Sequence, residues 1–101
     1  MAELLSDDQV AQALTKLESW QQNGAALTRS AELASFPQAI AVVNRIAEIA
    51  ENNNHHPDMQ ISWRTVVFRC STHSAGGITA LDVSLAEEID GVLEVFAQTS
   101  E

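Results

Sequence analysis

The chain has 101 residues, 46% of them hydrophobic, and its 14 acidic and 5 basic residues give a formal net charge of −9. This length fits one domain spanning residues 1–101, and no apolar run approaches the ~20 residues that cross a bilayer, so we expect no membrane partner. The acidic surplus repels phosphate backbones and argues against direct nucleic-acid binding. The first residues are acidic, unlike those of a signal peptide, and this predicts a cytoplasmic protein.

The N-terminal third predicts a helix followed by a hairpin. Ser6 and Gln9 have the spacing of a capping box, and apolar residues then recur at helical spacing as far as Leu17. Asn23 and Gly24 tolerate the positive φ angles of a tight turn. We therefore expect antiparallel strands at about 18–22 and 25–33.

A long central helix is predicted next. Ser35 has the character of an N-cap, Pro37 is tolerated in a first turn, and an apolar pattern continues to Ala50. The helix should end near residues 52–54, because asparagine accepts left-handed geometry and Pro57 prevents its continuation. Its apolar surface is broad enough to contact both the sheet and another chain.

The C-terminal half predicts a second hairpin and a third helix. Residues 59–72 are strand-like but too long for one strand, so we place strands at 59–63 and 65–72, divided at Arg64 and Thr65. Thr79 and Asp82 have capping-box spacing before a helix with an apolar stripe. The order αββαββα indicates an α+β fold, with helices against one face of an antiparallel sheet.

The three histidines of the chain lie at two element ends. His55 and His56 follow the central helix, and His73 follows the last strand. Imidazole can both donate and accept protons near neutrality, because its unperturbed pKa is about 6.5. Glu51 lies four residues before His55, so the two share a face if the helix continues. This pattern indicates a proton-transfer site.

Structural explanations compete with this reading. His55 and His56 could simply cap a helix, His73 could be a solvated loop residue, and Asp82 could serve only its capping box. Trp63 could be a core aromatic of the hairpin or a wall on which a flat ring stacks.

Other chemistries have weaker support. Three histidines with a nearby carboxylate could ligate a metal, but the usual spaced ligand pairs are absent, so we predict no metal. No phosphate-cradling glycine loop or Gly-x-Ser-x-Gly turn occurs. Cys70 lies in an apolar strand pattern and is more typical of a buried hydrophobe than of a catalytic thiol.

Taken together, these residues resemble a family signature. The spacing of Glu51, the run from His55 to Pro57, Trp63, His73 and Asp82 is similar to that of the pterin-4a-carbinolamine dehydratases, and the likeness spans nearly the whole chain. The resemblance implies three helices on one side of a four-stranded antiparallel sheet. It also implies a hydro-lyase that converts a 4a-hydroxytetrahydropterin to the quinonoid dihydropterin, recycling the cofactor of aromatic amino-acid hydroxylases.

The resemblance also implies site residues. The catalytic group would be His55, His56, His73 and Glu51. The substrate-binding group would be Asn54, Ser71, Thr72, Ser74, Trp63 and Asp82. Many family members have aspartate at the position of Asn54, and an aromatic residue is frequent at that of Met59, so the pocket rim should differ here.

The reaction suits these side chains. A proton must reach the hydroxyl that leaves ring carbon 4a, and another must leave the adjacent nitrogen, so paired histidines can serve without a metal or redox cofactor. We expect His55 and His73 to act on opposite sides of the substrate, His56 to bind the pterin and assist, and Glu51 to orient an imidazole. The family implies a homodimer or homotetramer. Alternatives are a non-catalytic dimerisation module, like relatives that bind a homeodomain transcription factor, and a pterin-binding protein without turnover.

Overall fold

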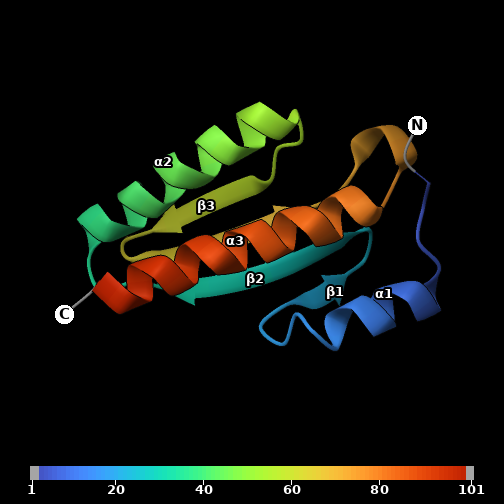
Figure 1. Ribbon diagram of the computed structural model, residues 1–101, viewed down its shortest axis with the longest axis horizontal. Helices are drawn as coiled ribbons and strands as arrows, with labels where there is room; N and C mark the ends of the chain where they lie inside the picture. Colours follow the sequence, from blue (N-terminus) through green and yellow to red (C-terminus); the bar gives the residue numbers. More distant parts are fainter. Residues whose placement is uncertain (1–2, 100–101) are drawn as a thin grey trace.

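The computed structural model describes residues 3–99 and has the predicted element order (Figure 1). A short 3₁₀ turn, η1, precedes the last helix. The elements are α1 (Asp7–Leu14), β1 (Gln21–Asn23), β2 (Ala26–Glu32), α2 (Phe36–Asn53), β3 (Asp58–Ser62), β4 (Thr65–Cys70), η1 (His73–Ala75) and α3 (Ala80–Thr99). No helix of this described part is long and apolar enough to cross a membrane.

The four strands form one antiparallel sheet in the order β1-β2-β4-β3. Helices α2 and α3 lie along one face of it, and α1 lies beside β1 (Figure 1). The alternating side chains Val66, Phe68 and Cys70 of β4 point into the core, whereas Val67 and Arg69 are exposed. The predicted α+β architecture is therefore confirmed.

The helix boundaries follow the predicted caps. The Ser6 hydroxyl accepts a hydrogen bond from the Gln9 backbone, and the Gln9 side chain accepts one from the Ser6 backbone. Beyond Leu14 the chain tightens into i−3 hydrogen bonds, and this places Leu17 in the core although α1 has ended. Asn54 ends α2 in the left-handed conformation, with φ 52°.

The strand boundaries differ from the prediction by up to three residues. The first hairpin turns at residues 24–25, so Asn23 belongs to β1, which begins at Gln21 rather than residue 18. The second hairpin turns at Trp63 and Arg64, not at Arg64 and Thr65, and Trp63 has a positive φ of 55° despite its bulk. The β-branched and aromatic residues that predicted the strands did not by themselves show where the two turns lie.

The strand register decides which segments meet. Asp58, the first residue of β3, pairs with Arg69 near the end of β4. The loop that leaves α2 and the loop that leaves β4 are therefore neighbours at one end of the sheet. The Trp63 turn lies at the opposite end of the same hairpin.

Candidate functional site

A fully buried carboxylate organises the end of the sheet where the histidine-bearing loops meet. Asp82 lies in the first turn of α3 and is 0% exposed. Its Oδ1 lies 2.7 Å from His55 Nε2, and its Oδ2 accepts hydrogen bonds from the Thr72 hydroxyl at 2.7 Å and the Thr79 backbone at 2.9 Å. Asp82 therefore serves the cap of α3 and also holds a histidine from the segment after α2.

The donors around Asp82 determine how protons are arranged. An ionised carboxylate only accepts hydrogen bonds, so the Thr72 hydroxyl donates to it, and the Thr79 hydroxyl, 2.8 Å away, donates to Thr72. By the same reasoning, His55 presents Nε2–H to Asp82. Its Nδ1 is then the nitrogen that carries a lone pair and can accept a proton.

The Nδ1 atom of His55 also remains accessible. The His55 side chain is 13% exposed. In the described part of the chain, the buried side-chain polar atoms without a hydrogen-bond partner are Arg29 Nε and Arg64 Nε, and His55 Nδ1 is not among them. No hydrogen bond from the described residues occupies this nitrogen, so it reaches solvent at the edge of the cluster.

His56 forms a separate pair on the surface. Its Nε2 lies 2.8 Å from Glu51 Oε2, and both side chains are exposed, at 55% and 79%. We expected Glu51 to share a face with His55. The α2 helix ends at Asn53, however, and the left-handed Asn54 turns the chain, so Glu51 meets the next histidine instead.

His73 begins the η1 turn directly after Thr72. Its backbone is anchored through this neighbour, because Thr72 is 5% exposed and its amide donates to the Gly77 carbonyl at 2.8 Å. The His73 side chain itself is exposed. The anchored turn thus presents an accessible imidazole at the end of the sheet that also carries His55.

The structure gives different positions to the residues that we expected to bind substrate. Asp82 and Thr72 are buried and mutually bonded, so they support the site rather than face a ligand. The Ser71 hydroxyl donates to the Ala25 carbonyl at 2.7 Å. Asn54 and Ser74 are exposed.

Trp63 does not join this cluster within one chain. It is 71% exposed at the opposite end of the β3–β4 hairpin, and the Arg64 guanidinium lies 5.0 Å from its ring centroid. It is therefore not a hairpin core aromatic.

A cleft of about 470 Å³ opens beside His55, between the end of α2 and the first turns of α3. Its lining is Asn53, His55, Leu81, Ser84, Leu85 and Glu88. Neither Ser84 nor Glu88 was among the residues that we expected at the site. Their spacing with Leu81 marks one face of α3, but this signal is informative only once the end of α2 is known to lie against that face.

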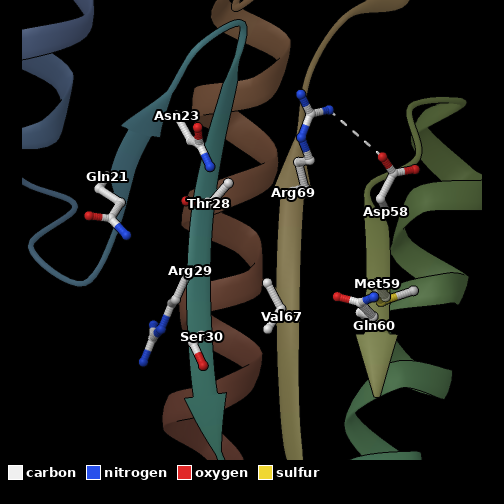
Figure 2. A pocket seen from close by; sticks show the side chains of 10 residues that line it. All are labelled: Gln21, Asn23, Thr28, Arg29, Ser30, Asp58, Met59, Gln60, Val67 and Arg69. Atoms are coloured by element: carbon white, nitrogen blue, oxygen red, sulfur yellow. Dashed lines mark ion pairs between the residues drawn. The ribbon is translucent and has the colours of Figure 1, made fainter. Parts of the chain in front are cut away.

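A larger cleft, of about 600 Å³, lies over the sheet face that α2 and α3 leave open (Figure 2). Its lining comes from all four strands, and Figure 2 shows Arg69 reaching toward Asp58, with 3.9 Å between Nη1 and Oδ2. The lining is Gln21, Asn23, Thr28, Arg29, Ser30, Asp58, Met59, Gln60, Val67 and Arg69. Because it contains no histidine, this cleft lacks the groups for proton transfer near neutral pH.

Cys70, the last residue of β4, is fully buried at the end of the sheet that carries His55 and His73. Burial, followed by the charges of Asp82 and Asp58, raises the pKa of its thiol from 9.0 to about 12. A thiol that stays protonated at neutral pH is a poor nucleophile, as predicted for a structural cysteine. Within residues 3–99, no group of three or more His, Cys, Asp or Glu side chains is placed to hold a metal ion.

Comparison with known proteins is consistent with this arrangement. The family model described as "Pterin 4 alpha carbinolamine dehydratase" matches residues 3–92. A candidate pterin-4-alpha-carbinolamine dehydratase from Nocardia farcinica is 54% identical over 88 residues, covering 87% of this chain and 93% of its own. One from Mycolicibacterium smegmatis is 50% identical over 90 residues, covering 89% and 96%.

A solved structure is also similar. The transcriptional coactivator/pterin dehydratase from Brucella melitensis has a TM-score of 0.84 and 30% identity, covering 87% of this chain and 96% of its own. Identity at this level over most of both chains establishes common membership. The chain belongs to the pterin-4a-carbinolamine dehydratase family.

Proposed function

We propose that this protein is a hydro-lyase that removes water from a 4a-hydroxytetrahydropterin to give the quinonoid dihydropterin. The single observation that carries the proposal is the pairing of His55 Nε2 with the buried carboxylate of Asp82 at 2.7 Å. This contact fixes the ring and its tautomer and leaves Nδ1 as an accessible proton acceptor. Family membership supplies the substrate class.

The chemistry is a redox-neutral elimination. His55 Nδ1 takes the proton from the ring nitrogen next to carbon 4a, and the electron pair of that N–H bond forms the new double bond to carbon 4a. The bond from carbon 4a to oxygen breaks, and the departing hydroxyl takes a proton from His73 and leaves as water. Asp82 stabilises the imidazolium that forms on His55, as a buried carboxylate does for a catalytic histidine.

His56 and Glu51 act at the rim of the site in this proposal. Their exposed pair, at 2.8 Å, orients the His56 ring so that it binds the pterin and assists proton transfer. An exposed ion pair contributes little to stability, about 0–1 kcal/mol, so its loss should affect catalysis more than folding.

The test is stopped-flow absorbance of a 4a-hydroxytetrahydropterin, which also dehydrates without enzyme. Wild-type protein should accelerate the loss, whereas His55→Gln and His73→Ala should each reduce the acceleration by about 10²–10⁴-fold. The glutamine amide of the first variant keeps a donor for Asp82, so its melting temperature controls for folding. Full rates in both variants would disprove the assignment.

Self-association into a homodimer or homotetramer, a cytoplasmic location and a link to an aromatic amino-acid hydroxylase remain predictions of the family resemblance. The α2–α3 side supplies one relevant observation. Val95 is 58% exposed there and lines a groove together with Ile49 and Phe96. Sedimentation velocity over a range of concentrations would determine the oligomeric state.

A further inference from the structure

A carboxylate also lines the cleft beside His55. Glu88 lies on α3, is partly buried, and lines the cleft together with His55. We propose that Glu88 binds the hydrogen-bond donor edge of the substrate, the 2-amino group and the neighbouring ring N–H of the pyrimidine ring. This inference rests on the proposed function and extends it to a residue that determines substrate recognition.

The cleft is lined by both apolar and polar side chains. Leu85 is 2% exposed and Leu81 is 46% exposed, and both line the cleft as part of α3. Ser84, Asn53 and Glu88 add polar side chains around these leucines. A volume of about 470 Å³ lies within the usual range of roughly 300–1,000 Å³ for small-molecule sites. A flat heterocycle with polar edges fits such a lining.

Glu88 is held in place by one hydrogen bond and can still accept others. The Asn53 amide donates to Glu88 Oε1 at 2.8 Å, which ties the end of α2 to α3. Among the described residues, the structure gives Glu88 Oε2 no hydrogen-bond partner. Each carboxylate oxygen has two lone pairs, so both oxygens can accept from a pair of parallel N–H groups.

The chemistry of the ligand matches this acceptor. The 2-amino-4-oxo pyrimidine of a pterin presents two adjacent N–H donors, and a carboxylate can accept both in the bidentate manner in which it accepts from a guanidinium. The reacting carbon 4a and its nitrogen lie at the other side of this ring, the side that the proposal directs toward His55. A net charge of −9 also disfavours anionic ligands and suits a neutral, donor-rich one.

The experiment measures equilibrium binding, so it does not depend on turnover. A 7,8-dihydropterin has no 4a-hydroxyl to lose, and its dissociation constant can be determined by fluorescence titration. Glu88→Gln should weaken binding about 10- to 100-fold, because a charge-assisted pair becomes a neutral one. The 2-desamino analogue keeps the ring N–H but lacks one of the two donors, so Glu88→Gln should weaken its binding clearly less than it weakens binding of the dihydropterin.

Two further variants separate recognition from structure. Glu87→Gln removes the same charge from an exposed neighbour on α3 that does not line the cleft, and it should bind like wild type. Asn53→Ala removes the tie to α2 but keeps the Glu88 carboxylate. If Glu88 acts only through this tie, Asn53→Ala and Glu88→Gln will weaken binding equally, and the inference fails.

The outcomes are distinguishable from failure of the proposed function. An unchanged dissociation constant in Glu88→Gln, an equal loss for both ligands, or no binding by wild type would overturn the assignment of Glu88. Wild-type protein that binds the dihydropterin through Glu88 but does not accelerate dehydration would contradict the enzymatic proposal alone.

Discussion

Replacing Asp82 with asparagine tests how the buried carboxylate supports the site. The amide oxygen of the introduced side chain can still accept from Thr72 and from the Thr79 backbone, where Asp82 Oδ2 accepts at 2.7 and 2.9 Å. The amide NH₂ group then faces His55 Nε2, which must become an acceptor. The exchange therefore moves the His55 proton to Nδ1, the nitrogen that should accept a proton from the substrate.

The expected loss of activity is large, and the loss of stability is moderate. A correctly placed general base contributes about 10²–10⁴-fold, and a wrong tautomer in the His–Asp pair of a serine protease costs about 10⁴-fold in kcat, so we expect a loss within this range. Each of the three hydrogen bonds made by Asp82 weakens by about 1 kcal/mol when a neutral amide replaces the carboxylate, or up to about 3 kcal/mol in total.

Stopped-flow measurement of the dehydration rate, with urea unfolding of the same variant, separates these effects. Asp82→Asn should remain folded, since domains are stable by roughly 5–15 kcal/mol. A variant with the wild-type rate and pH profile would refute the argument that Asp82 sets the tautomer of His55. A variant that loses stability and no activity would confine Asp82 to its role as a cap.

Three further predictions concern the surroundings of the site. Thr72→Val keeps the shape but removes the hydroxyl between Asp82 and Thr79, so urea unfolding should show a loss of about 1–3 kcal/mol. Asp90→Ala removes the acceptor shared by Trp20 and Arg29, and a similar loss of stability with an unchanged dehydration rate is expected. Cys70 should resist a thiol reagent at pH 8 until urea is added. Because its pKa rises to about 12 on folding, stability should also fall as pH rises from about 9 to 12.

The sequence predicted the helices better than the hairpins. Capping boxes are local, and the one at Ser6 formed as expected. At Thr79 one half formed, because Asp82 accepts from the Thr79 backbone while the Thr79 hydroxyl accepts from the Leu81 backbone rather than from that of Asp82. The second turn was misplaced because Trp63 adopts a left-handed conformation that its residue type does not favour. Strand ends depend on register across the sheet, and this is set by side chains distant in sequence.

The sequence offered candidate residues for the site but not the contacts between them. The sequence identified the three histidines, Glu51 and Asp82 as a group. It paired Glu51 with the wrong histidine, because the pairing depends on the turn at Asn54 after α2 ends. It also could not show that Asp82 is buried beneath His55, since this contact spans 27 positions and arises from the packing of α3 against the end of α2.

The protonation state of His55 tests the central claim most directly. Long-range ¹H–¹⁵N correlation spectra of the ¹⁵N-labelled protein above the pH of imidazole protonation reveal which ring nitrogen carries the proton. We predict that His55 holds its proton on Nε2, opposite Asp82, and that Nδ1 is unprotonated. A proton on Nδ1, or a tautomer mixture like that of a free imidazole, would contradict it.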